Sequence, residues 1–262
     1  MKPLVEVERV DSTAVVWFNR PDELNGMTNE LETEYFDALQ AADGDPEVRA
    51  IIVSGRGRAF SAGADLQALQ GLAKSGSRGL DEDRRGHLVA LEIDTPTIAA
   101  INGPAVGMGF VHALTCDVRL ASSSASFATG FSKLGLIAEQ AISWLLPQIA
   151  GRAVALDLLL SSRRIDAREA LAAGLVTKVV GDGDLLPEAL AYASLLAETT
   201  SPYATAVIKQ QINRDPVSSL KSVVDESHRL AEAALDGPDF REGIDSLTHR
   251  RRPRYPGVPR PH

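Results

Sequence analysis

The sequence contains little cysteine and few aromatic residues. Cys116 is its one cysteine, and aromatic side chains make up 5% of its 262 residues. A lone cysteine can form no internal disulfide and offers no thiolate cluster to zinc or an iron–sulfur group. Because this usage is typical of a reducing compartment, we expect a cytoplasmic protein.

Basic residues are outnumbered by acidic ones. The chain has 27 lysines and arginines against 35 aspartates and glutamates, and its formal net charge is −8. Binding to nucleic acid draws on a basic surface, so this balance argues against a nucleic-acid partner. The basic run at residues 250–254 is one short tail and does not change that expectation.

The signatures of several enzyme classes are missing as well. The sequence contains no GxGxxG, GxxxxGK, HExxH or GxSxG run. Its five histidines never stand three or four residues apart, as a metal pair on one helix would require. A nicotinamide, flavin, metal or serine-triad enzyme is therefore poorly supported, and we expect no metal site.

One run without a formal charge, residues 95–116 apart from His112, is long enough to span a bilayer. Residues that disfavour a continuous helix interrupt it: Pro96, Asn102, Gly103, Pro104, Gly107 and Gly109. We therefore predict a buried strand, a turn and the start of a buried helix, with His112 as a core residue. The N-terminus has no apolar signal segment, so a soluble protein without a membrane partner is expected.

The order of predicted elements indicates the α/β class. A hairpin is expected over residues 5–18, and Thr28 can cap the helix that follows it. Strands alternate with helices up to residue 180, and only helices follow. The predicted strands are 48–53, 97–101, 118–121 and 175–180, the polar stretch 74–86 is a predicted loop, and the C-terminal helices are 185–199, 203–213, 217–235 and 238–248.

Two glycine-flanked segments, residues 58–66 and 98–110, share one pattern. Each reads as a strand, a turn of very small residues and the start of a helix. Helix N-termini carry unpaired N–H groups and a partial positive charge. Two such ends aimed at one point would hold a developing oxyanion, whereas two unrelated turns would hold nothing.

Three runs in these and later segments resemble the enoyl-CoA hydratase/isomerase (crotonase) superfamily. They are AFSAGADL, then PTIAAINGPAVGMG followed by CDVRLASSSASF, and then FSKLGLIAEQAISWLLPQIAG. The resemblance extends from Asn19 to Pro253. It implies a spiral core of repeated ββα turns over residues 1–195 and a helical trimerisation region over residues 196–262. The expected assembly is a trimer or a dimer of trimers.

The same resemblance implies roles for individual residues. The backbone N–H groups of Ala64 and Met108 would form the oxyanion hole for an acyl-CoA thioester. Four further residues would border the coenzyme A substrate: Ala62, Asp65, Leu66 and Gly107. Read from the residues alone, Asp65 is instead an acid at a helix start. No cofactor other than the coenzyme A of the substrate is implied.

The sequence departs from the hydratase pattern at two positions. Hydratases of this family use two glutamates, and the matching positions here are Val111 and Phe131. Adding water across a double bond needs one group to activate the water and another to supply a proton. With both positions apolar, the standard two-acid hydration is poorly supported.

One nearby acid, Glu139, resembles the single glutamate in the LG-x-x-x-E segment of Δ3,Δ2-enoyl-CoA isomerases. Moving a double bond takes one proton from C2 and returns one to C4, which a single carboxylate can do. The apolar residues before it, Leu136 to Ala138, are expected to shield it from water. The alternative is that Glu139 merely begins a helix through Trp144, where acids are common.

The prediction is therefore an acyl-CoA enzyme that performs Δ3,Δ2-enoyl-CoA isomerisation through an enolate. Two alternatives remain. One is an enoyl-CoA hydratase with a non-standard site, in which Glu139 activates water. The other is a catalytically silent acyl-CoA-binding subunit.

Overall fold

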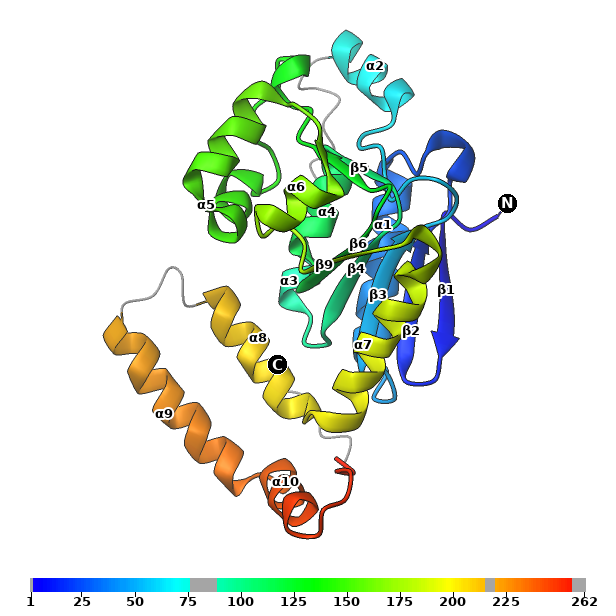
Figure 1. Ribbon diagram of the computed structural model, residues 1–262. Coiled ribbons are helices and arrows are strands. Elements are labelled where there is room, and N and C mark those ends of the chain that lie inside the picture. The colour runs from blue at the N-terminus through cyan, green and yellow to red at the C-terminus, as the bar shows by residue number, and fades with distance from the viewer. Residues whose placement is uncertain (1, 76–88, 215–219, 256–262) are drawn as a thin grey trace.

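The structure is a computed structural model that describes residues 2–75, 89–214 and 220–255 (Figure 1). Its centre is a six-stranded sheet in the order β1-β2-β3-β4-β6-β9. The strands are β1 (Val5–Val10), β2 (Thr13–Phe18), β3 (Ala50–Gly55), β4 (Thr97–Ile101), β6 (Val118–Ser122) and β9 (Lys178–Val180). The predicted α/β class is confirmed.

The sheet is mostly parallel. β1 and β2 form the predicted antiparallel hairpin, and every later pairing in this sheet is parallel. Every residue of β3 and β4 is buried, as expected for strands covered on both faces. Because parallel strands end at the same edge, the chain leaves β3 and β4 side by side, at residues 56 and 102.

The chain continues from β4 into a second sheet of three strands, in the order β5-β7-β8. Its strands are β5 (Pro104–Val106), β7 (Ser126–Ala128) and β8 (Ile165–Asp166). The sequence did not predict these strands, because runs of two or three residues are too short to show an alternating pattern. With β4 and α4 (Met108–Thr115), β5 completes a ββα unit.

Helices cover both faces of the six-stranded sheet. On one face α1 (Asn29–Gly44), α4 and α5 (Ile142–Ser161) contribute to the main core. On the other face α7 (Leu185–Thr199) packs Leu185, Ala189 and Ala193 against the sheet. The shorter helices are α2 (Leu66–Ser75), α3 (Val89–Glu92) and α6 (Ala167–Ala172).

Helix α1 begins as the sequence predicts. The Thr28 side chain accepts a hydrogen bond from the Leu31 N–H at 3.2 Å, so Thr28 is the N-cap. Leu31, Phe36 and Leu39 lie on the buried side of the helix.

Helix α5 is long and apolar enough to cross a membrane by length and composition alone. Gly151, with φ 79° and ψ 156°, interrupts its helical geometry and divides it into two shorter helices. Each part is shorter than the roughly 20 residues that a transmembrane helix needs. Leu145, Leu146 and Leu158 of this helix are buried against the main core.

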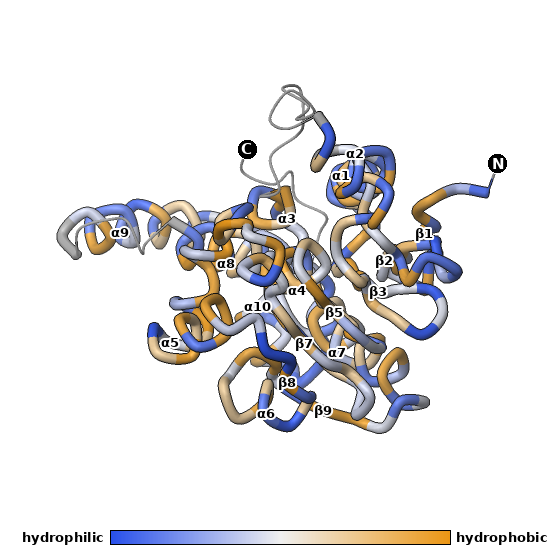
Figure 2. The backbone as a smooth tube through the Cα atoms, turned by 90° about the horizontal axis from the view of Figure 1, so that it is seen from above, coloured by the Kyte–Doolittle hydropathy of each residue, from blue (hydrophilic) through white to orange (hydrophobic). Residues whose placement is uncertain are grey.

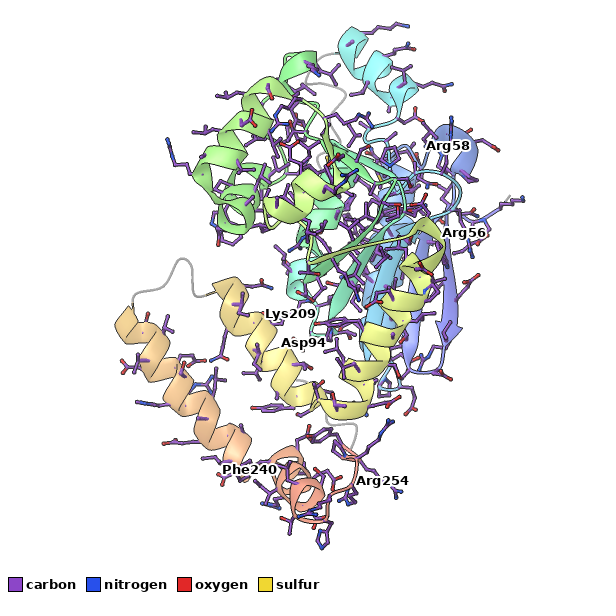
Figure 3. The ribbon with its side chains drawn as sticks, viewed as in Figure 1. Arg56, Arg58, Asp94, Lys209, Phe240 and Arg254 are labelled. Atoms are coloured by element: carbon purple, nitrogen blue, oxygen red, sulfur yellow. The ribbon has the colours of Figure 1, made fainter. Side chains whose placement is uncertain are left out.

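The last helices, α8 (Pro202–Arg214), α9 (Leu220–Asp236) and α10 (Pro238–Thr248), extend away from the sheet (Figure 1). Figure 2 shows α9 well out to one side of the core. Lys209 lies on α8 (Figure 3) and is buried. It attaches α8 to the core by donating to the carbonyls of Ala90 and Thr95, and it lies 3.0 Å from Asp117. The four predicted C-terminal helices correspond to α7–α10. Residues 76–86 of the predicted loop and 217–219 of the predicted third helix lie outside the described residues.

The single cysteine belongs to the main core. Cys116 is 2% exposed, and burial together with the Asp117 carboxylate raises the pKa of its thiol to about 12. Since the thiolate is the form that attacks a disulfide reagent, we expect the folded protein near neutral pH to react at least about 10³-fold more slowly than the urea-unfolded chain. Stopped-flow absorbance measures both rates. Equal rates would contradict the burial of Cys116.

Candidate active site

Three glycine turns meet beside the second sheet. Gly63, Gly107 and Gly130 have φ angles of 95°, 51° and 77°, a region that other residues rarely adopt. A Cβ atom on Gly63 would lie 2.7 Å from the Val106 carbonyl oxygen and 3.6 Å from the Gly107 Cα. A Cβ atom on Gly107 would lie 3.6 Å from the Thr129 carbonyl oxygen. A side chain at Gly63 would therefore collide with the Val106 carbonyl, while at Gly107 the positive φ angle favours glycine.

Backbone hydrogen bonds join the three turns. The Ser61 N–H donates to the Pro104 carbonyl at 3.0 Å, and the Val106 N–H donates back to Ser61 at 3.0 Å. The Gly107 N–H donates to the Ala128 carbonyl at 3.0 Å. The two glycine-flanked segments predicted from the sequence are therefore in contact, and the segment that leads to Phe131 lies against them.

Ala64 lies opposite Met27 in a short parallel bridge. The Met27 N–H donates to Gly63 at 2.7 Å, and the Asp65 N–H donates to Met27 at 2.9 Å, forming a parallel bridge between Met27 and Ala64. In such a bridge the N–H of Ala64 points away from Met27. Among the described residues that N–H has no acceptor, and Ala64 is exposed.

Met108 is the first residue of α4, and its N–H also has no acceptor among the residues described. The preceding residue, Gly107, provides no side-chain cap. The Met108 side chain itself is 5% exposed and packs in the main core. Ala64 and Met108 thus each follow a glycine of the Gly63–Gly107 contact, and each carries a donor for which no described residue is the acceptor. Such donors suit an oxygen that gains negative charge.

Asp65 is occupied by structural contacts. Its Oδ1 accepts from the backbone N–H groups of Gln67 and Ala68 at the start of α2, and its Oδ2 lies 3.1 Å from Arg20. Partial burial opposes ionisation, but the Ala68 N–H, the Arg20 guanidinium and the Gln67 N–H together lower the pKa of Asp65. These contacts match its interpretation as an acid at a helix start. Of the residues next to it, Ala62 is half-buried and Leu66 is 69% exposed.

Val111 and Phe131 are both buried, at 0% and 5% exposure. They belong to the same apolar core as Met108, on α4 and just after the Gly130 turn. The two positions that the resemblance matches to the hydratase glutamates are therefore part of the apolar core.

Glu139 precedes α5 in a strained turn. Gln140 and Ala141 have φ angles of 54° and 60°, a left-handed conformation that costs a residue with a side chain about 1–2 kcal/mol. The Glu139 side chain is half-buried and has no hydrogen bond or ion pair with any residue that the structure describes. Strain of this kind is a feature of functional turns.

Two expectations about this turn are wrong. Helix α5 begins at Ile142, so Glu139 does not start it. Leu136 and Ile137 are 39% and 78% exposed in the single chain and do not shield Glu139 from water. The turn at Gly135, with φ 73°, directs the chain outward before it returns at Ile142.

The core histidine is confirmed. His112 on α4 is fully buried, and its Nε2 lies 3.2 Å from the carboxylate of Glu32, which is 2% exposed and belongs to α1. The sequence analysis did not identify Glu32, because the acid looks like an ordinary first-turn residue of α1.

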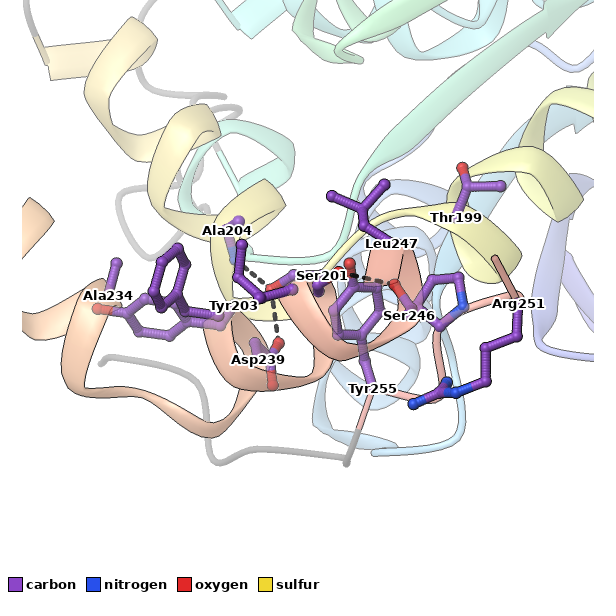
Figure 4. A pocket seen from close by; sticks show the side chains of 14 residues that line it. Thr199, Ser201, Tyr203, Ala204, Ala234, Asp239, Ser246, Leu247, Arg251 and Tyr255 are labelled. Atoms are coloured by element: carbon purple, nitrogen blue, oxygen red, sulfur yellow. Dashed lines mark hydrogen bonds between the residues drawn. The ribbon is translucent and has the colours of Figure 1, made fainter. Parts of the chain in front are cut away.

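A hollow of about 530 Å³ lies elsewhere, among α8, α10 and the tail after α10 (Figure 4). Asp239, 6% exposed, accepts a hydrogen bond from the Ser201 hydroxyl at 2.5 Å, and Ser201 in turn caps the Ala204 N–H. These contacts attach α10 to α8. None of the three glycine turns contributes to this hollow.

The family model for enoyl-CoA hydratase/isomerase matches residues 8–258. A "Probable enoyl-CoA hydratase" of Mycobacterium bovis is 35% identical over 250 residues, covering 95% of this chain and 96% of the relative. The "1,2-epoxyphenylacetyl-CoA isomerase" of Escherichia coli is 32% identical over 244 residues, covering 91% and 93%.

Solved structures agree with the fold. The crystal structure of an enoyl-CoA hydratase subunit from Geobacillus kaustophilus superposes with a TM-score of 0.90 at 31% identity. The match covers 97% of this chain and 98% of that one.

Proposed function

Because the chain belongs to the enoyl-CoA hydratase/isomerase family, we propose that it moves the double bond of a 3-enoyl-CoA thioester to the 2,3 position. One observation carries the choice of reaction. The two positions that hold acids in hydratases are the buried, apolar Val111 and Phe131, while Glu139 is half-buried and has no partner among the described residues. This leaves one carboxylate for a reaction that needs one.

The thioester carbonyl would accept hydrogen bonds from the N–H groups of Ala64 and Met108. Removing the C2 proton places negative charge on that oxygen, and the two donors stabilise it more strongly than they stabilise the neutral carbonyl. Glu139 would take the proton from C2, hold it while the enolate conjugates with the double bond, and return it to C4. No net proton is consumed, so no second acid is required.

The coenzyme A portion would lie along the segment that contains the first donor. Ala62, Asp65, Leu66 and Gly107 are the residues proposed to border it. Leu66 offers an exposed apolar side chain, and the absence of a side chain at Gly107 lets a ligand approach the backbone. Asp65 would act by keeping α2 and Arg20 in place, since its oxygens already accept three hydrogen bonds.

The name of the relative from Mycobacterium bovis favours a second candidate, hydration of a 2-enoyl-CoA. An assay that offers matched 2-enoyl and 3-enoyl thioesters distinguishes the candidates. Isomerisation without hydration supports the proposal. Hydration alone supports the second candidate, and binding without turnover supports a silent acyl-CoA-binding subunit.

We also propose that the chain assembles as a homo-oligomer, a trimer or a dimer of trimers, in the cytoplasm. Helix α10 supports the assembly, because Phe240, Ile244 and Leu247 follow helical spacing and are 45%, 50% and 76% exposed in the single chain. A stripe of this kind is costly to leave in water. A second copy of the chain would cover it.

Removal of residues 238–262 is expected to release monomers or cause aggregation, because it deletes this stripe. Leu247→Glu should weaken assembly in the same direction, while Arg241→Glu, on the polar side of α10, should not. Sedimentation equilibrium at micromolar concentration measures the mass. A wild-type monomer at that concentration would contradict the proposal.

A further inference from the structure

The main core contains an ionisable pair that the proposed reaction does not use. The carboxylate of Glu32 lies 3.2 Å from the Nε2 of His112, and the two side chains are 2% and 0% exposed. Burying two polar groups among apolar side chains is costly unless they bond to each other. Neither group touches solvent, so neither serves solubility.

Glu32 and His112 belong to α1 and α4, the helices next to the N–H donors of Ala64 and Met108. Glu32 is in the first turn of α1, and its own N–H donates to the Thr28 carbonyl at 3.0 Å. Thr28 follows Met27, which forms the bridge that holds Ala64. His112 lies one turn after Met108 on the same face of α4. A bond between the side chains therefore links the supports of the two donors.

Aromatic rings hold the imidazole in this position. Phe18, Tyr35 and Phe36 surround His112, with ring centroids at 6.1, 5.1 and 5.9 Å. The ring can turn little within this packing, so its Nε2 remains directed at Glu32. A rigid side chain transmits the position of one helix to the other, whereas a flexible one would not.

We propose that the Glu32–His112 pair positions the oxyanion hole. The contact between the two side chains, on the core side of α1 and α4, sets the distance between the N–H groups of Ala64 and Met108. This inference rests on the proposed function of those donors. Both residues are positioning residues, because neither touches the substrate. Two donors serve one oxygen only when they lie at the right separation, and a displacement of about 1 Å can cost a factor of about 10² in rate.

His112→Leu is expected to lower kcat by about 10–100-fold with KM within about twofold, since the donors act mainly in the transition state. Glu32→Gln keeps a hydrogen bond to the imidazole and should retain most of the activity. The double variant Glu32→Met/His112→Leu replaces the pair with apolar groups, which commonly restores stability. It should melt near the wild-type temperature and still have the low kcat.

Two control variants separate positioning from folding. Thr97→Val removes the two hydrogen bonds of the buried Thr97 hydroxyl, which donates to the Asp117 carboxylate at 2.9 Å and accepts from the Asp117 N–H at 3.0 Å, at the other end of α4. It should lower the melting temperature with little change in kcat. Tyr35→Phe keeps the ring beside His112 and removes a buried hydroxyl with no hydrogen-bond partner among the described residues, so neither quantity should fall.

Methionine NMR tests the inference without turnover. The chain has three methionines, Met1, Met27 and Met108. Met27 pairs with Ala64 in the parallel bridge, and Met108 carries the second donor itself. With methyl-¹³C methionine, the double variant should shift the signals of both Met27 and Met108, and Thr97→Val should leave them in place.

Unchanged Met27 and Met108 signals in the double variant, or a kcat that recovers together with its melting temperature, would overturn the inference. If the wild-type protein turns over no enoyl-CoA, the proposed function fails, and the methyl signals alone decide the positioning role.

Discussion

Glu139→Gln is expected to lower the isomerase kcat by about 10²–10⁴-fold, the usual contribution of a general base. The amide has nearly the same size as the carboxylate but cannot accept the C2 proton. Because the Glu139 side chain bonds to no described residue, its replacement should leave the melting temperature unchanged. Coupled absorbance assays at saturating 3-enoyl-CoA measure kcat.

Lys133→Gln is the matched control for this variant. Lys133 is exposed on the short turn Ser132–Leu134, and its replacement also removes one charge from the segment before α5. Its kcat should stay within about twofold of wild type, since exposed charges interact weakly across water. Calorimetric affinity for a saturated acyl-CoA should be the same in both variants.

The outcome distinguishes the three functions. Loss of isomerisation with retained acyl-CoA binding supports the shuttle. A protein that hydrates 2-enoyl-CoA would lose that activity instead. If wild type and Glu139→Gln both remain at background rates, the chain is a silent binder, and the shuttle role of Glu139 is refuted.

Met108→Pro is expected to lower kcat by about 10²–10³-fold, because it deletes one oxyanion donor. Met108 is the first residue of α4, a position where proline fits and where the N–H is unpaired in any helix. The helix should therefore persist, and far-UV circular dichroism with thermal melting checks it. An ester in place of the Gly107–Met108 amide removes the same N–H with even less change of shape.

Met108→Ala supplies the contrast, because it keeps the N–H and shortens the side chain. It should reduce stability, since Met108 is 5% exposed in the core, and truncation of a buried methionine costs about 2–5 kcal/mol. Its kcat should fall far less than that of Met108→Pro. An equal loss in both variants would assign the effect to the side chain and contradict the donor role.

Much of the architecture was predictable from local patterns in the sequence. The hairpin of β1 and β2, the Thr28 cap and the strand β4 were all expected, because alternation, capping residues and turn residues act over a few positions. Helices α7 and α10 match their predicted ranges, residues 185–199 and 238–248. The candidate segments were also visible, since glycine marks close backbone approach.

Which parts of the chain these segments contact was decided by the tertiary structure. Ala128 accepts a hydrogen bond from Gly107 at the end of the register in which β5 and β7 pair, and strands of three residues leave no pattern in a sequence. The exposure of Ile137 likewise depends on a left-handed turn at Gly135, which moves an apolar run out of the core.

The Glu32–His112 pair shows the same division. From the sequence, Glu32 is a first-turn acid and His112 is a residue of a buried helix, and both descriptions are correct. Their contact joins residues 80 positions apart and exists only because α1 and α4 pack on one core. The sequence determined each helix through short-range hydrogen bonding and periodicity, whereas packing over the whole chain determined which side chains the helices share.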